Sequence, residues 1–228
     1  MTNLEILTAF ELEINKLDDV LTKPATDDSL FWINQAISKF IKLRFNGDFV
    51  HHTGFEQTEK RRVDLIHLLR EEVLEPNDVE SYTTYDVYPY EYPEDFLYVL
   101  NERVVISDLK EDNKYDTGVF ECTRDNFMYR INNSLTDFHY RFHKARPLRI
   151  RTADGCELLT DKNYLIQEYK LGYIKTPTPV SLEDPYETYK DFEDTQLYEI
   201  IKMAAQMYLE NKKDERYQTI SNEINTQE

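Results

Sequence analysis

Residues 148–159, LRIRTADGCELL, place an Asp-Gly dipeptide between two short runs that contain apolar residues. Asp-Gly is a strong signal for a β-hairpin, because tight hairpin turns need positive φ angles that Asp and Gly tolerate. Along a strand, successive side chains point to opposite faces, so Leu148 and Ile150 would face one side and Arg149 and Arg151 the other. The stretch therefore predicts a hairpin with one apolar and one basic face.

Other segments with the composition of strands lie on both sides of this hairpin. They cover residues 96–106 (FLYVLNERVVI), 118–123 (GVFECT) and 164–176 (YLIQEYKLGYIKT). Runs rich in β-branched and aromatic residues are typical of strands. Together with the hairpin they predict a central antiparallel β region.

Helical patterns precede and follow the β region. Thr2 and Glu5 read T-x-x-E, which is typical of a capping box at the start of a helix. Apolar residues at spacings of three and four then form one stripe: Leu7, Phe10, Ile14, Leu17 and Leu21. A second stripe predicts a helix over residues 28–46, and a third predicts a C-terminal helix from about Thr195: Leu30, Ile33, Ile37 and Phe40; Leu197, Ile201, Ala204 and Tyr208.

Residues 51–62, HHTGFEQTEKRR, allow two interpretations. Thr53 and Glu56 form a second T-x-x-E, and an apolar stripe follows, so the segment would enter a third helix: Val63, Ile66, Leu69 and Val73. Alternatively, His51, His52 and Glu56 would bind a metal ion. We favour the helix, because a capping Glu is already occupied and two histidines are two ligands short of a closed zinc shell.

These patterns predict an α+β fold with an N-terminal three-helix region, a central antiparallel β region with an extended Tyr/Pro-rich arm, and a C-terminal helix. We expect a helical region over residues 1–76, and a β-rich region over residues 77–180 that carries an acidic tyrosine arm and a basic segment. A Pro-rich linker and the C-terminal helix would cover residues 181–211. Residues 212–228 have few apolar side chains and are predicted to be a loose polar tail.

The composition indicates a folded, acidic protein. The chain has 228 residues, and its 44 acidic residues against 27 Lys and Arg give a net charge of −17. General nucleic-acid binding is disfavoured, since neutralising phosphates needs cations. The two cysteines form no C-x-x-C pair, which favours a reducing compartment.

Several common enzyme motifs are absent from the sequence. The five glycines are never clustered, so no glycine-rich phosphate loop exists, and G-x-S-x-G and H-E-x-x-H do not occur. The N-terminus has no basic leader with an apolar block, and no run approaches the roughly 18 apolar residues of a membrane-spanning helix. These absences weigh against the common nucleotide-dependent and hydrolytic enzymes and against membrane insertion, and the sequence assigns no catalytic, cofactor-binding or metal-binding residue.

Residues 71–95 are acidic and rich in tyrosine. They contain nine Asp and Glu and no Lys or Arg, and Pro89 and Pro93 exclude a helix. Five tyrosines lie between these charges: Tyr82, Tyr85, Tyr88, Tyr90 and Tyr92. Either this segment is an acidic surface linker whose tyrosines cover the core, or it is an arm that lies on a neighbouring chain.

Residues 141–151 reverse the sign of the charge. No acid occurs from Phe138 to Ala153, and five cations lie between: Arg141, Lys144, Arg146, Arg149 and Arg151. A solvated basic face is one interpretation. The other is a surface that binds a negatively charged partner.

Three passages resemble the structural ring proteins of crAss-like bacteriophages: FNGDFVHHTGFEQTEKRRVDL, RINNSLTDFHYRFHKARPLRI and QLYEIIKMAAQMYLENKKDERYQ. The resemblance covers most of the chain. It implies a neck ring, or head-to-tail connector, between the portal and the tail of a short-tailed virion, with an expected twelve-fold homo-oligomer. Portal protein, other ring proteins and passing double-stranded DNA would be its partners, and no catalytic residue is implied.

A ring needs two complementary faces on each subunit. The tyrosine-rich segment and the basic segment could form such a pair, and Gln57, Lys60 and Arg61 would add a docking contact at the start of the third helix. Two other functions stay open from the sequence. One is a small metal-dependent hydrolase that uses His51, His52, His139 or His143, and the other is a glycan-binding module built on the tyrosines.

Overall fold

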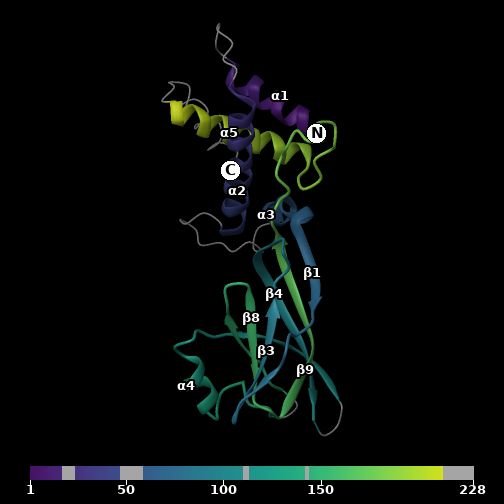
Figure 1. Cartoon of the computed structure of the whole chain (residues 1–228), viewed down its shortest axis with the longest axis vertical. Helices are drawn as coiled ribbons and strands as arrows, with labels where there is room; N and C mark the ends of the chain where they lie inside the picture. The colour runs from purple at the N-terminus through teal and green to yellow at the C-terminus, as the bar shows by residue number, and fades with distance from the viewer. Residues whose placement is uncertain (17–23, 47–58, 110–112, 142–143, 213–228) are drawn as a thin grey trace. The chain divides into compact units, whose positions relative to one another are not determined.

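The computed structural model describes residues 1–16, 24–46, 59–109, 113–141 and 144–212 (Figure 1). The chain divides into two compact units. We call Leu69–Thr176 the β unit. The helical unit consists of Met1–Leu68 together with the chain that follows from Pro177.

The helical unit is built from both ends of the chain. Its elements are α1 (Asn3–Ile14), α2 (Thr26–Asn46), α3 (Glu59–Asp64), the 3₁₀ turn η2 (Ile66–Leu68) and α5 (Asp194–Lys212). The predicted capping box of α1 is confirmed, because Thr2 Oγ1 accepts from the Glu5 amide and Glu5 Oε2 accepts from the Thr2 amide. α5 packs against α1 and α2, with Phe10 and Tyr208 in edge-to-face contact. The predicted stripes of α2 and α5 supply this core, including Ile33, Phe40 and Ile201.

The prediction that the third helix continues through Leu69 and Val73 is wrong. α3 ends at Asp64, and residues Leu69–Leu74 form strand β1. β1 pairs with β9 (Tyr164–Lys175) in antiparallel register, from Leu69 opposite Ile174 to Leu74 opposite Tyr169. An apolar residue every third or fourth position does not exclude a short strand, and here the pairing with β9 decides the structure. The proposed cap at Thr53 and Glu56 and the residues Leu17 and Leu21 lie outside the described residues.

The β unit contains two sheets. The four-stranded sheet has the order β1-β9-β4-β5, in which β4 is Phe96–Asp108 and β5 is Lys114–Gly118. The five-stranded sheet has the order β2-β3-β8-β7-β6, with these bounds: β2 Glu80–Ser81, β3 Asp86–Glu91, β8 Gly155–Thr160, β7 Leu148–Arg151 and β6 Phe120–Glu121. All pairs are antiparallel except β6 with β7. The predicted α+β class with a central antiparallel region is confirmed.

The hairpin at residues 148–159 is also confirmed. β7 and β8 pair from Leu148 opposite Leu159 to Arg151 opposite Cys156, and the Thr152 amide donates to the Gly155 carbonyl at 3.0 Å. A second constraint, in addition to the turn, requires glycine at position 155. A Cβ at this position would lie 1.9 Å from the backbone oxygen of Tyr90 in β3, so the close approach of the strands requires glycine.

The five-stranded sheet is covered on both faces. One face packs on the four-stranded sheet through residues that include Tyr90, Leu158 and Tyr169. The other packs on a second cluster that includes Leu148, Ile150 and Ile131 of α4 (Phe127–Asn132). The predicted alternation along β7 is therefore correct, but the side chain of Arg149 points into the space between two sheets rather than into solvent.

Candidate assembly surface

The five cations of the basic segment separate into three environments. Arg141, Lys144 and Arg146 are exposed and line a cleft of about 440 Å³. Arg149 is only 5% exposed and is paired with carboxylates. Arg151 is exposed and lies over the Phe96 ring, 5.8 Å from its centroid. The continuous basic patch that the sequence suggested is thus reduced to a cluster of three cations.

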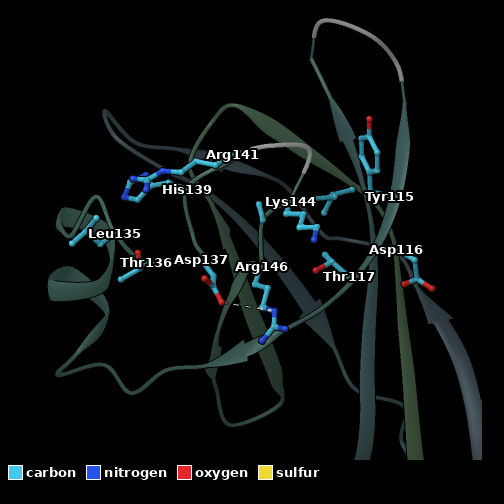
Figure 2. A pocket seen from close by; sticks show the side chains of 12 residues that line it. Tyr115, Asp116, Thr117, Leu135, Thr136, Asp137, His139, Arg141, Lys144 and Arg146 are labelled. Atoms are coloured by element: carbon cyan, nitrogen blue, oxygen red, sulfur yellow. Dashed lines mark ion pairs between the residues drawn. The ribbon is translucent and has the colours of Figure 1, made fainter.

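The cleft lies between β5 and the loop residues 135–141 and 144–146 (Figure 2). Figure 2 shows the Lys144 side chain directed toward Thr117 of β5, whereas Asp116 points away to the other side of the strand. Arg146 Nε lies 4.0 Å from Asp137 Oδ2, and both side chains are more than half exposed. Such exposed pairs are weak, so Arg146 can exchange this contact for a stronger anionic partner.

Ala145 anchors the loop between these two cations. Its side chain is 2% exposed and belongs to the same core cluster as Ile106 of β4. The loop is also held by the Arg146 amide, which donates to the Asp137 carbonyl at 2.8 Å, and by the Tyr140 amide, which donates to Asp161 Oδ2 at 2.8 Å. The cations on either side of Ala145 therefore project from a fixed backbone.

Arg149 occupies a buried network that the sequence did not reveal. Its Nη1 lies 2.7 Å from Glu102 Oε2 of β4, and its Nη2 lies 2.7 Å from Glu121 Oε1 of β6. The Tyr169 hydroxyl donates to the other oxygen of Glu102 at 2.6 Å. Burial is the main cause that raises the pKa of Tyr169, and the charge of Glu102 adds to it. Glu102 and Arg149 thus neutralise each other between the sheets, where an unpaired charge would be costly.

The tyrosine-rich segment is a part of the β unit rather than a separate arm. Tyr88 and Tyr90 lie on β3, are 6% and 3% exposed, and face the core between the sheets. Tyr92 is half-buried and stacks on Phe96. Tyr82 is 47% exposed and stacks on the half-buried Tyr85. The interpretation that the tyrosines cover the core therefore holds for Tyr88 and Tyr90, and only Tyr82 is largely open to solvent.

The acidic residues of this segment remain on the surface. Glu71, Glu72 and Glu75 are exposed, as are Asp78 and Glu80. Glu71 pairs with Arg103 at 3.3 Å, where both side chains are at least half exposed, and Glu72 accepts from the Tyr173 hydroxyl at 3.2 Å. The β unit therefore presents acidic side chains from β1 and the connection that follows it, and cations beside β5.

The predicted docking cluster lies at the start of α3. Lys60 is exposed and Arg61 is half-buried, both on α3, while Gln57 lies outside the described residues. This cluster belongs to the helical unit, whereas the basic segment belongs to the β unit.

Of the histidines proposed for a hydrolase, the structure describes only His139. Its Nε2 is 3.0 Å from the Ile131 carbonyl oxygen, and its Nδ1 is 3.7 Å from Asp161. His51, His52 and His143 lie outside the described residues. In the described part of the chain, no three His, Cys, Asp or Glu side chains are grouped so that they could hold a metal ion. Within the same ranges, none of the helices combines the length and the apolar character needed to cross a lipid bilayer.

A second buried cation lies in the helical unit and was also missed in the sequence. Arg44 of α2 is 6% exposed, contacts Asp64 at 2.8 Å through Nε and pairs with Glu199 of α5 through Nη2. Its guanidinium also lies 4.7 Å from the centroid of the Phe40 ring. Neither partner is near Arg44 in sequence, so no local pattern could have indicated this cluster.

Comparison with known proteins identifies the family. No curated protein sequence matches the chain. A family model described as phage tail ring protein 3/4 of crAss-like phages matches residues 1–190, which is well over half of the 228 residues. The match covers the β unit and the part of the helical unit up to residue 190, and it confirms the family resemblance. Two of the three sequence passages lie within the matched residues, and the third, which begins at Gln196, lies beyond them. The chain therefore belongs to the phage tail ring protein 3/4 family, a structural component of the virion.

Proposed function

We propose that this chain assembles into a closed homo-oligomeric ring in the neck of the virion, between the portal and the tail, without catalytic activity. The ring family supports the oligomer and its place in the tail. The expected symmetry is twelve-fold, to match a portal, and double-stranded DNA would pass through the ring without sequence-specific contacts.

The observation that carries the proposal is the separation of charge on the surface of the β unit. Acidic side chains extend from β1 through Glu80, while Lys144 and Arg146 lie beside β5. A ring joined head to tail needs two different surfaces that complement each other, whereas a two-fold dimer uses one surface twice. Exposed charge pairs add roughly 0–1 kcal/mol each, but every interface of the ring repeats them.

Further contacts would connect this ring to its neighbours along the tail. Lys60 and Arg61 of α3, with Gln57, and the exposed ring of Tyr82 are the residues proposed for portal or ring docking. Arg151 is available as a rim cation. We do not include Arg149, Tyr88 and Tyr90, because they are buried within the β unit.

The test is to image the purified protein alone and together with the portal and tail proteins encoded beside it. Negative-stain class averages should show closed rings that join the portal-containing assembly. A protein that stays monomeric in every mixture would contradict the proposal. Stoichiometric metal or hydrolytic activity in the purified protein would instead support the hydrolase alternative.

A further inference from the structure

We propose that neighbouring subunits of the ring are joined by β-sheet pairing, in which the open edge of β5 in one copy receives β1 of a second copy. This inference rests on the proposed ring and specifies how one subunit contacts the next. It would convert the four-stranded sheets of all copies into one continuous sheet around the ring.

The four-stranded sheet has two different ends. In its order β1-β9-β4-β5, the two outer strands are β1, which pairs with β9, and β5, which pairs with β4. Each outer strand therefore has one paired edge and one outer edge. Among the described residues, no other strand pairs with either of these two edges. Edge strands present unpaired N–H and C=O groups that can pair with another chain.

The hydrogen bonds of the β4–β5 hairpin show which groups of β5 point outward. The Asp108 amide donates to the Asn113 carbonyl at 3.3 Å, and these residues continue the register in which Ile106 lies opposite Tyr115. Bonded and non-bonded pairs alternate along an antiparallel ladder, so residues 115 and 117 bond to β4. The backbone groups of Lys114, Asp116 and Gly118 therefore point to the open edge.

The surface around β5 is open at two places. A Cβ on Gly118 would meet no atom within 4 Å, so the face of the sheet toward which it points is uncovered at this end of β5. The cleft of about 440 Å³ lies beside Asp116 and Thr117 and is bounded on its other side by Lys144 and Arg146. A strand added at the edge of β5 would place the side chains that share a face with Thr117 on the side of the sheet where these two cations lie.

The number of strands fixes the direction of the junction. Each neighbouring pair in the sheet is antiparallel, so β1 and β5 run in opposite directions. If all copies have the same orientation along the strands, β1 of one copy meets β5 of the next as an antiparallel pair. The contact uses two different edges, so it is heterologous and can close into a ring.

Charge favours β1 as the strand that binds. β1 and the residue after it carry Glu71, Glu72 and Glu75 against one cation, Arg70. On and beside β5, Lys114, Lys144 and Arg146 outnumber Asp116 and Asp137. Because β1 is already a strand, pairing requires little further ordering of the chain.

The first experiment traps the junction covalently in the full chain. Asp116→Cys is combined in turn with Glu71→Cys, Glu72→Cys or Val73→Cys, and the assembled protein is oxidised and run on a non-reducing gel. A head-to-tail junction should give a ladder of oligomers larger than dimers. Trapping should alternate between neighbouring β1 positions, because their side chains face opposite sides of the sheet.

Several controls make the trapping specific. Chains with a single added cysteine should not cross-link to themselves, whereas a two-fold contact would give dimers only. The native Cys122 and Cys156 are buried, so the wild-type chain should give no ladder. A chain that forms rings in micrographs but gives no ladder overturns the β1–β5 junction and leaves the proposed ring intact. A chain that forms no ring even when it is mixed with the portal protein contradicts the proposed function instead.

The second experiment blocks the edge without changing the hairpin. Asp116→Pro removes an outward amide, and Asp116→Ala removes only the carboxylate. The proline variant should lower the association constant by about tenfold or more, the loss expected for about 1.4 kcal/mol, while the alanine variant should associate at least as well as wild type. Circular dichroism and the melting temperature report whether the proline variant is folded. If it misfolds, the charge exchange below decides.

The charge exchange uses two variants, and each is expected not to assemble by itself. Lys144→Glu with Arg146→Glu should prevent assembly through β5, and Glu71→Arg with Glu72→Arg should prevent it through β1. An equimolar mixture should regain part of the wild-type assembly, because the two reversed surfaces match. If the β5 variant assembles normally by itself but releases double-stranded DNA, these cations contact DNA and the inference is overturned.

Discussion

Arg149 of β7 donates from Nη1 to Glu102 Oε2 of β4 across 2.7 Å, so one buried ion pair joins the two sheets of the β unit. We expect Glu102→Ala to lower the free energy of unfolding by about 3–5 kcal/mol, because it leaves a buried guanidinium with one carboxylate fewer. Chemical denaturation of the full chain measures this loss. Arg151→Ala is the control and should change stability little, since Arg151 is exposed.

The paired substitution separates the network from simple packing. Glu102→Leu combined with Arg149→Met removes both charges and should be much less harmful than Glu102→Ala alone. The double variant must also leave Tyr169 without its carboxylate acceptor, so some loss remains. If the double variant is as unstable as Glu102→Ala, the unpaired charge is not the cause of the destabilisation.

Arg44 should have a similar importance in the helical unit. Arg44→Leu leaves Asp64 and Glu199 without their shared cation, and we expect the free energy of unfolding to fall by about 3–5 kcal/mol. Arg44→Lys keeps one charge but loses the forked geometry, so it should fall between wild type and the leucine variant. Lys42→Ala changes an exposed residue on the same helix and serves as the control. Thermal melting monitored by circular dichroism distinguishes the three variants.

Two glycines should respond in opposite ways to alanine. Gly155→Ala places a Cβ against the Tyr90 backbone oxygen and must displace β3 or β8, so we expect a clear drop in melting temperature. Gly118→Ala meets no neighbour and should be neutral, or stabilising by up to about 1 kcal/mol, because alanine has less conformational entropy in the unfolded chain. Equal losses in both variants would show that the approach of β3 to Gly155 is not a constraint.

Alkaline pH should destabilise the β unit. Burial raises the pKa of Tyr164 well above its ordinary value of 10, and it also raises the pKa of Tyr169. Below about pH 10 these phenols are neutral in both states, whereas above it the unfolded chain loses protons that the folded chain keeps. The free energy of unfolding should therefore fall as pH rises above about 10.

Denaturant titrations at about pH 8 and about pH 11 measure this effect. The raised pKa of the buried Cys156 thiol acts in the same direction from about pH 9. Tyr129→Phe changes a ring that is 70% exposed and should leave the pH dependence unaltered. Stability that is constant up to pH 11 would contradict the burial of these phenols.

Local signals in the sequence predicted much of the fold. Thr2 and Glu5 define a helix start through contacts only three residues apart, and Asp154-Gly155 defines a hairpin between adjacent strands. The secondary structure of residues 69–74 is not determined by neighbouring residues in the sequence, because these residues pair with β9, about a hundred residues later. A short segment whose apolar spacing suits a helix can become a strand when a distant edge offers hydrogen bonds.

The candidate surface was predicted only in outline. The reversal of charge between residues 71–95 and 141–151 is visible in the sequence, and the structure keeps Lys144 and Arg146 on the surface. The sequence could not show that Arg149 would be buried, because that depends on a second sheet covering the face opposite Leu148 and Ile150. For the same reason the sequence could not show that Tyr88 and Tyr90, which it suggested as contacts to another chain, lie in the core between the two sheets.

The order of the units along the chain has a consequence for synthesis. The β unit is inserted between two parts of the helical unit, and its ends meet where Leu69 pairs with Ile174. On the ribosome, all strands of the β unit are made before α5, which supplies Leu197 and Ile201 to the helical core. Each nascent chain therefore carries a complete β unit while its helical unit is still unfinished. If subunits join through the β unit as proposed, chains on one messenger would begin to associate at that stage, and translation itself would supply subunits at high local concentration.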